Sequence, residues 1–212
     1  MTISELCIPR LNLAPTVFIV DDDEAVRRSL ELLVREAGWR AESFASAEAF
    51  LAYPRVKTPK CLVLDVALPD LSGLDLQEQI SVDQPNIPII FFTSQGDVPM
   101  SVRAMRAGAF DFLTKPAADD ALLLAIGSAI ERSQTILLQE AALQVLSDRY
   151  DSLTPREREV MDLVVCGLLN KQIGSELGIS EITVKTHRAN VMRKMMAASL
   201  AALVRFHAKL FG

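Results

Sequence analysis

The chain has few cysteines, and their spacing excludes two ways of stabilising a small protein. Cys7, Cys61 and Cys166 are the only three in 212 residues, an odd number at wide spacing. They form no Cys-x-x-Cys pair and have no histidine at metal-ligand spacing, so the sequence predicts neither a zinc site nor a disulfide framework. We expect small buried apolar side chains or free thiols at these positions.

Long apolar runs and biased segments are also missing. No window approaches the roughly 18 apolar residues that cross a bilayer, and residues 1–15 lack the basic segment and apolar run of a secretion signal. There are no low-complexity tracts, and the only single-sign charge block is the short acidic run at 21–23. Because the chain is long enough for two modest domains, we expect a soluble, cytoplasmic protein with no membrane partner.

The net charge of −5 conceals a difference between the two parts of the chain. Residues 151–212 carry nine Lys or Arg against six Asp or Glu, which gives +3. Residues 1–150 carry 13 bases and 21 acids, which gives −8. Any polyanionic partner is therefore expected to meet the C-terminal part.

Short β-branched and aromatic runs alternate with helical patterns through residue 116. The expected strands are residues 16–20, 40–44, 60–64, 87–92 and 109–113. The expected helices between them are residues 24–38, 46–53, 73–82 and 97–107. This alternation predicts an α/β doubly wound domain with a five-stranded parallel sheet, in which ligands bind at the carboxyl ends of the strands.

The rest of the chain has only helical patterns. One long helix over residues 119–149 leaves the sheet domain, and Gly127 is its weak point. Four shorter helices follow, within residues 153–167, 170–180, 181–195 and 199–210. Thr154 and Glu157 have the spacing of a capping box at the start of the first of these. We expect an all-α four-helix domain joined to the sheet domain by the long helix.

Four of the expected strands end in side chains that would share one edge of the sheet. They are Asp21, Asp22 and Asp23 after the first strand, Asp65 after the third, Thr93 and Ser94 after the fourth, and Lys115 after the fifth. Carboxylates about 4 Å apart repel by about 4 kcal/mol per pair at an effective dielectric near 20. Such a cluster needs a cation, and its oxygen ligands suit Mg²⁺.

Taken singly, these residues have simpler interpretations. Asp23 is the expected N-cap of the first helix. Phe112 would be a core residue, and the others would be solvated strand-end side chains. Their occurrence together, in this order along the chain, favours a site that holds a phosphoryl group on Asp65.

Four segments resemble the signature segments of receiver domains of two-component response regulators. They are VFIVDDDE, LVLDVALPDLSG, FFTSQGDVPM and DFLTKP, within residues 16 to about 133. The resemblance implies that Asp65 is the phosphoacceptor, with Mg²⁺ held by Asp65, by Asp22 directly, by Asp21 through water and by the backbone carbonyl of Ala67. It also implies that Thr93, Lys115 and Phe112 sense the phosphoryl group and that the Lys115–Pro116 peptide is cis.

Two positions depart from the receiver pattern, and the sequence argues against two enzyme classes. Ala67 stands where long polar side chains are frequent, and Ala117 stands where Phe often follows Lys-Pro. A hydrolase of the haloacid-dehalogenase type requires a second Asp two residues after the nucleophile, but Ala67 occupies that place after Asp65. No GxGxxG follows the first strand, which argues against dinucleotide binding. We therefore do not expect an enzyme.

Residues 170–189 have the pattern of a helix-turn-helix with a turn at Gly178. On a helical wheel, Val184, Val191 and Met195 form a buried stripe, and Ile182 lies opposite them. The residues expected to contact DNA bases or phosphates are Asn170, Lys171, Thr183, Lys185, Thr186, Arg188, Ala189, Arg193 and Lys194. The alternative is an exposed cationic helix of a generic helical bundle.

The segment from LTPRERE to VMRKM closely resembles the LuxR-type DNA-binding domain, and the whole chain resembles a FixJ-type response regulator. Gly174 replaces the Ala usual in that domain, at a cost of about 1 kcal/mol in helix propensity. The implied organisation is an N-terminal lead (1–15), a receiver domain (16–133), a helical linker (134–150) and the DNA-binding domain (151–212).

These resemblances predict a phosphorylation-dependent transcription regulator. A sensor histidine kinase would phosphorylate Asp65, and the protein would then form a homodimer that binds promoter DNA, with RNA polymerase as a further candidate partner. A second hypothesis keeps the DNA-binding role but makes the receiver a phosphate-independent protein-interaction domain.

Overall fold

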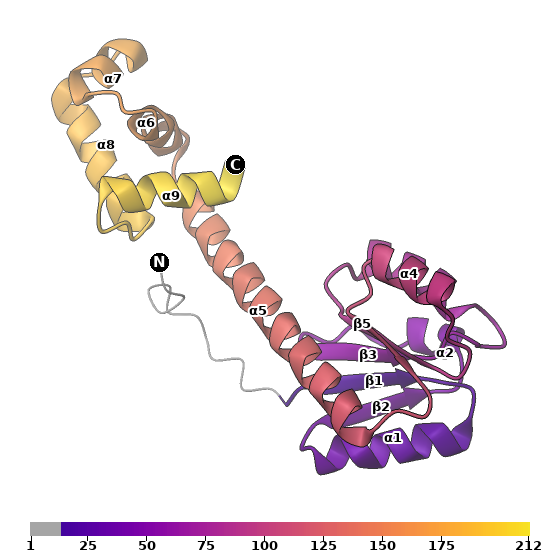
Figure 1. Cartoon of the computed structure of the whole chain (residues 1–212). Helices are drawn as coiled ribbons and strands as arrows, with labels where there is room; N and C mark the ends of the chain where they lie inside the picture. Colours follow the sequence, from indigo (N-terminus) through magenta and orange to yellow (C-terminus); the bar gives the residue numbers. More distant parts are fainter. Residues whose placement is uncertain (1–13) are drawn as a thin grey trace. The chain divides into compact units, whose positions relative to one another are not determined.

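The computed structural model describes residues 14–212, and these divide into two compact units (Figure 1). The division falls between Leu138 and Gln139, so the N-terminal unit here means residues 14–138 and the C-terminal unit residues 139–212. The predictions for Cys7 and for most of the N-terminal lead lie outside the described residues. In the part of the chain that is described, Cys61 is buried and Cys166 is exposed, and both are free thiols.

The N-terminal unit contains the predicted five-stranded parallel sheet. Its strands are β1 (Thr16–Val20), β2 (Arg40–Phe44), β3 (Lys60–Leu64), β4 (Ile89–Thr93) and β5 (Asp111–Thr114), in the order β2-β1-β3-β4-β5. The register places Val20 beside both Phe44 and Leu64. The ends of β1 and β3 are therefore level, and the residues that follow them emerge at the same edge.

The last two strands begin two residues later than predicted. Pro88 precedes β4, and its carbonyl accepts the hydrogen bond of the Leu62 N–H at 2.9 Å. Before β5, the Ala109 N–H donates to the Ala104 carbonyl at 3.0 Å, which places it in the turn after the preceding helix. The apolar runs are thus longer than the strands because their first residues pack in turns.

Helices cover both faces of the sheet (Figure 1). They are α1 (Glu24–Glu36), α2 (Ala47–Leu51), α3 (Gly73–Asp83), α4 (Val98–Arg106) and the first part of α5 (Asp119–Asp151). Val17 and Ile19 of β1 pack with α1 and α5, whereas Phe18 and Val20 pack on the opposite face. This alternation follows from the two-residue period of a strand and explains why β1 is apolar throughout.

The long helix α5 continues through Gly127, where an added Cβ would lie 3.9 Å from the Trp39 ring, an ordinary contact. By length and composition alone, α5 is the one described helix that is apolar enough to cross a membrane, which the prediction of no membrane-length window overlooked. Part of that apolar character serves the two cores, since Ile126 is buried in the N-terminal unit and Leu146 in the C-terminal unit.

The C-terminal unit is helical, as predicted. After the end of α5 it contains α6 (Pro155–Val165), α7 (Asn170–Leu177), α8 (Glu181–Lys194) and α9 (Leu200–Phe211). The capping box of Thr154 and Glu157 is present at the start of α6. A Cβ at Gly174 would lie 2.8 Å from the Ile179 carbonyl oxygen, so glycine lets α7 and the following turn approach closely.

Candidate functional site

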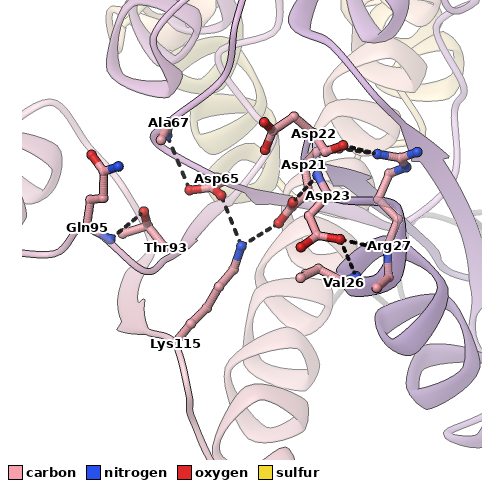
Figure 2. A network of polar contacts seen from close by, with 11 residues as sticks. Asp21, Asp22, Asp23, Val26, Arg27, Asp65, Ala67, Thr93, Gln95 and Lys115 are labelled. Carbon is pink, nitrogen blue, oxygen red and sulfur yellow. Dashed lines mark hydrogen bonds and ion pairs between the residues drawn. The ribbon is translucent and has the colours of Figure 1, made fainter.

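Three carboxylates meet at the carboxyl edge of the sheet (Figure 2). Asp21 and Asp22 follow β1, Asp65 follows β3, and one carboxylate oxygen from each lies within 4.8 Å of the others. The Asp65 N–H donates to the Val20 carbonyl at 2.9 Å, which extends the sheet ladder by one residue and fixes the position of this side chain. Asp21 and Asp65 are buried, whereas Asp22 is exposed.

Lys115 supplies one positive charge, which both buried carboxylates share. Its Nζ lies 2.5 Å from Asp21 Oδ2 and 3.0 Å from Asp65 Oδ2. The Lys115–Pro116 peptide bond is cis, as the resemblance to receiver domains implies. Burial opposes the charge of Lys115, but hydrogen bonds to Asp21 and Asp65 raise its pKa above the ordinary value. The ammonium therefore stays protonated at neutral pH.

The two buried carboxyls differ in acidity. Burial raises the pKa of Asp21, and the hydrogen bonds that it accepts offset only part of this shift. Burial would also raise the pKa of Asp65, but hydrogen bonds from Thr93, Lys115 and the Ala67 N–H, the last at 3.2 Å, hold that pKa below its ordinary value. Asp65 is therefore ionised at neutral pH, which a nucleophilic carboxylate requires.

Arg27 of α1 holds the turn that carries Asp21 and Asp22, and Asp23 caps the same helix. The Arg27 guanidinium donates to the carbonyls of Asp21 and Asp22 at 2.8 and 2.9 Å. Asp23 caps α1, as predicted, by accepting from the Ala25 N–H at 2.8 Å. The sequence interpretation missed Arg27. Its position one turn into the helix after an acidic run is the signal that points to it.

The predicted sensing residues line the other side of the cluster. Thr93 is 0% exposed, and its hydroxyl accepts the Gln95 N–H at 3.2 Å. Phe112 is half-buried, with its ring centre 5.9 Å from that of Phe91. A Cβ at Gly96 would lie 3.0 Å from the Phe112 ring and 2.6 Å from a Thr114 methyl. Gly96 was also missed, because this close approach between the loop after β4 and strand β5 is not visible in the sequence.

The residues present fit a magnesium ion. The carboxylates border a cavity of about 370 Å³ that is also lined by Ala67, Thr93 and Gln95. Its candidate ligands are oxygen atoms, and one carboxylate of the three is exposed to solvent, which suits an ion that keeps several of its waters. Asp21, Asp22 and Asp65 would hold it, and Ala67 lines the same cavity.

The C-terminal unit presents one face of α8 to solvent. Val184, Val191 and Met195 are buried, as predicted, in the core of this unit. The exposed residues on the opposite side are Ile182, Lys185, Thr186, Ala189 and Arg193. The predicted base-reading side chains are thus accessible together on a single helix.

Among the other predicted DNA contacts, Asn170, Thr183 and Arg188 have hydrogen-bond partners within the protein. Lys171 is exposed, and the hydroxyls of Thr183 and Ser180 are hydrogen-bonded at 2.8 Å. Arg188 donates to the Asn170 side-chain oxygen at 3.1 Å, which joins α8 to the start of α7. Asn170, Thr183 and Arg188 are half-buried, so these side chains still reach the surface of the helix-turn-helix.

Lys194 lies in a different environment from the one predicted for a phosphate contact. Its Nζ is 2.6 Å from Glu157 Oε2 and 3.0 Å from the Ser152 carbonyl, and the pair is largely buried. Burial of Glu157 would raise its pKa, but hydrogen bonds from Lys194 and from the Thr154 N–H lower it. The ammonium ties the end of α8 to the capping box of α6, so its contact is structural.

Comparison with known families divides the chain at a similar place. Residues 17–127 match the family described as response regulator receiver domain. Residues 151–207 match the family described as bacterial regulatory proteins, luxR family. The first match contains the carboxylate cluster, and the second contains the helix-turn-helix.

Known proteins similar to this chain match it over most of their length. Nodulation protein W of Bradyrhizobium diazoefficiens is 48% identical over 189 residues, 89% of this chain and 83% of that protein. Transcriptional regulatory protein FixJ of the same organism is 44% identical over 190 residues, covering 89% and 92%. The solved structure of response regulator StyR has a TM-score of 0.84 at 46% identity, covering 93% and 100%.

Proposed function

Because the chain belongs to the response regulators that join a receiver domain to a LuxR-type DNA-binding domain, we propose that phosphorylation of Asp65 controls its binding to promoter DNA. The observation that carries this proposal is the geometry at Asp65. An ionised carboxylate at the sheet edge lies 3.0 Å from an ammonium and beside two further carboxylates. The family regulates transcription, and we propose no enzymatic turnover of a substrate.

The phosphoryl donor is proposed to be a sensor histidine kinase. An oxygen of Asp65 attacks the phosphorus atom, a P–O bond forms, and the P–N bond to the kinase histidine breaks as the imidazole leaves. Lys115 stabilises charge on the transferred group, and the Thr93 hydroxyl donates a hydrogen bond to it. A bound Mg²⁺ would neutralise charge between the carboxylates and the phosphoryl oxygens.

Phosphorylation adds roughly −1.5 to −2 charges beside Lys115. We propose that Lys115 and Thr93 then move onto the phosphoryl group and that Phe112 rotates inward. The phosphoryl group favours this conformation because it interacts with it more strongly than with the conformation of the unphosphorylated protein. The change repacks the face made by α4, β5 and the first part of α5.

Val98, Val102 and Met105 are exposed on α4. These apolar side chains support the proposal that the phosphorylated protein forms a homodimer.

The proposed organisation is a lead (residues 1–15), a receiver domain (16–133), a helical linker (134–150) and a DNA-binding domain (151–212). The proposed contacts to DNA come from the predicted set without Lys194, whose charge is paired within the protein. We further propose a cytoplasmic protein with promoter DNA, and in turn RNA polymerase, as partners.

The proposal is tested by footprinting on genomic fragments in the presence and absence of beryllofluoride and Mg²⁺. We expect protected sites that appear or strengthen only when both are present, since the phosphoryl mimic binds beside carboxylates that require Mg²⁺. Acetyl phosphate should label the protein in a Mg²⁺-dependent way. Equal protection with and without the phosphoryl mimic would instead support the phosphate-independent interaction domain.

Ala67 is expected to lengthen the life of the phosphorylated protein. It lines the cavity around Asp65 but has no polar group that could orient an attacking water, which leaves Gln95 as the main side chain able to do so. We expect Ala67→Asn to release phosphate several-fold faster. The measurement is the decay of labelled protein after removal of the phosphodonor, with Ala52→Asn, at the end of α2, as the matched control. Equal decay in Ala67→Asn and the wild type would contradict the hypothesis.

A further inference from the structure

The outward face of α8 is apolar along its centre. Ile182 is 77% exposed, and Thr186 and Ala189 are exposed as well. At about 100° per residue these three positions fall within an arc of about 60°, directly opposite the buried stripe. Arg193 lies on the same line at the end of the helix. We call Ile182, Thr186 and Ala189 the methyl stripe.

Thr186 contributes a methyl group to this stripe because its hydroxyl is engaged elsewhere. The Oγ1 of Thr186 donates to the Ile182 carbonyl at 3.1 Å, one turn back along the helix. A hydroxyl bonded along its own helix is less available to a ligand, and the γ-methyl is the part of the side chain left without a partner. The three side chains therefore offer carbon atoms, and no free polar group, to whatever meets the helix.

The charges around the methyl stripe identify the occupant as a polyanion with apolar groups on its surface. Helices α7 and α8 carry five bases and two acids. Lys185 borders the stripe, and its Nζ lies 3.0 Å from Glu181 Oε1. Both side chains are exposed, so this ion pair restrains Lys185 only weakly. An apolar protein surface would not require this flanking positive charge. The major groove of DNA supplies both features, since phosphates border it and thymine exposes a C5-methyl group inside it.

We infer that the methyl stripe recognises thymine methyl groups, so that the preferred DNA site carries thymines at the base pairs that face Ile182, Thr186 and Ala189. This inference rests on the proposed DNA-binding function and adds the base that α8 reads. The first residues of a recognition helix lie nearest the base edges. Ile182 and Thr186, in the first two turns of α8, are therefore the main specificity-determining residues, and Ala189 allows the helix to approach closely.

Uracil tests the inference because it differs from thymine only by the missing C5-methyl group. A randomised duplex library is bound to the full chain with beryllofluoride and Mg²⁺, and the enriched duplex is synthesised with each thymine replaced singly by uracil. We expect one or two positions at which uracil weakens binding about fourfold, which corresponds to about 0.8 kcal/mol for a buried methyl group. The remaining thymines should tolerate the replacement.

The Thr186→Ser variant links one of these positions to the stripe. It removes the γ-methyl and keeps the hydroxyl, so the thymine-to-uracil ratio at one position should fall from about fourfold to near one. Thr135→Ser is the matched control, because it makes the same chemical change at an exposed threonine of α5 whose hydroxyl also donates to the carbonyl one turn back, that of Glu131, at 2.9 Å. It should leave every thymine-to-uracil ratio unchanged.

Two results would overturn the inference alone: equal binding of thymine and uracil duplexes at every position, or a ratio unaffected by both Thr186→Ser and Ile182→Ala. A protein that enriches no sequence at all would overturn the proposed function and the inference with it. The two failures are distinct, because the first is observed on a duplex that the chain binds.

Discussion

Replacing Asp65 with Asn should abolish the response of the protein to a phosphodonor. The amide has no nucleophilic oxygen anion, and the variant removes a carboxylate that accepts hydrogen bonds from both Thr93 and Lys115. We expect no labelling by acetyl phosphate and no stimulation of dimerisation or DNA binding, whereas basal DNA binding remains. Labelling, sedimentation and footprinting measure the three quantities.

The variant should fold, because Asn has nearly the same shape as Asp and its amide oxygen is able to accept the Ala67 N–H. Lys115 would keep its second partner, Asp21, at 2.5 Å. Asp83→Asn, an exposed change at the end of α3, is the matched control and should respond as the wild type does. Dimerisation and binding of the Asp65→Asn protein that still rise with phosphodonor would show that the proposed mechanism is wrong.

Replacing Lys194 with Ala should destabilise the C-terminal unit by about 3 kcal/mol. Removing one partner of a buried ion pair leaves the other charge unpaired, at a typical cost of about 3–5 kcal/mol. The lower end applies because the Lys194 side chain is 23% exposed, whereas Glu157 is 5% exposed. Urea unfolding, followed by the helical signal of the C-terminal unit, gives the difference in free energy of unfolding.

A second substitution separates the lost charge pair from lost packing. Lys194→Ala combined with Glu157→Gln should recover part of the stability, because the glutamine is neutral and is still able to accept the Thr154 N–H. Lys185→Ala is the control, since its exposed pair with Glu181 should contribute about 0.5 kcal/mol or less. A Lys194→Ala protein as stable as Lys185→Ala would contradict the structural role of this lysine.

The same pair predicts a pH dependence of stability. The pKa of Glu157 is lowered in the folded protein, so its contribution is complete above the ordinary glutamate value of about 4.3 and is lost as the pH falls through the lower, folded value. The wild type should therefore lose more stability than the Lys194→Ala variant between about pH 5 and the folded pKa.

Much of the N-terminal unit follows from local patterns in the chain. The five apolar runs are strands because they are short, β-branched and bounded by turn residues, and Asp23, Ser46, Ser72 and Asp97 cap the helices by hydrogen bonds to nearby N–H groups. The convergence of Asp21 and Asp65 could also be predicted. Parallel strands bring their carboxyl ends to one edge, so that the order of the polar residues along the chain indicates a shared site.

Contacts between distant segments account for what the patterns missed. Gly96 and Lys194 approach an aromatic ring and a buried carboxylate that belong to other elements. Lys194 is the last residue of α8, and its place on the helix and its charge both predicted a contact with a DNA phosphate. Its actual partner, Glu157, lies 37 residues away along the chain, and no local pattern relates the two positions.

The position of Asp65 at the carboxyl edge of the sheet, and the shared face of Ile182 and Thr186 on α8, were therefore predictable from residue order, because strand ends and helical faces repeat with fixed periods. Which charges remain free was settled by folding. Packing α8 onto α6 turns Lys194 inward to Glu157, whereas Ile182 and Thr186 on the opposite side are left facing solvent. A helical period places side chains on a face, but the neighbouring elements determine which of those faces is buried.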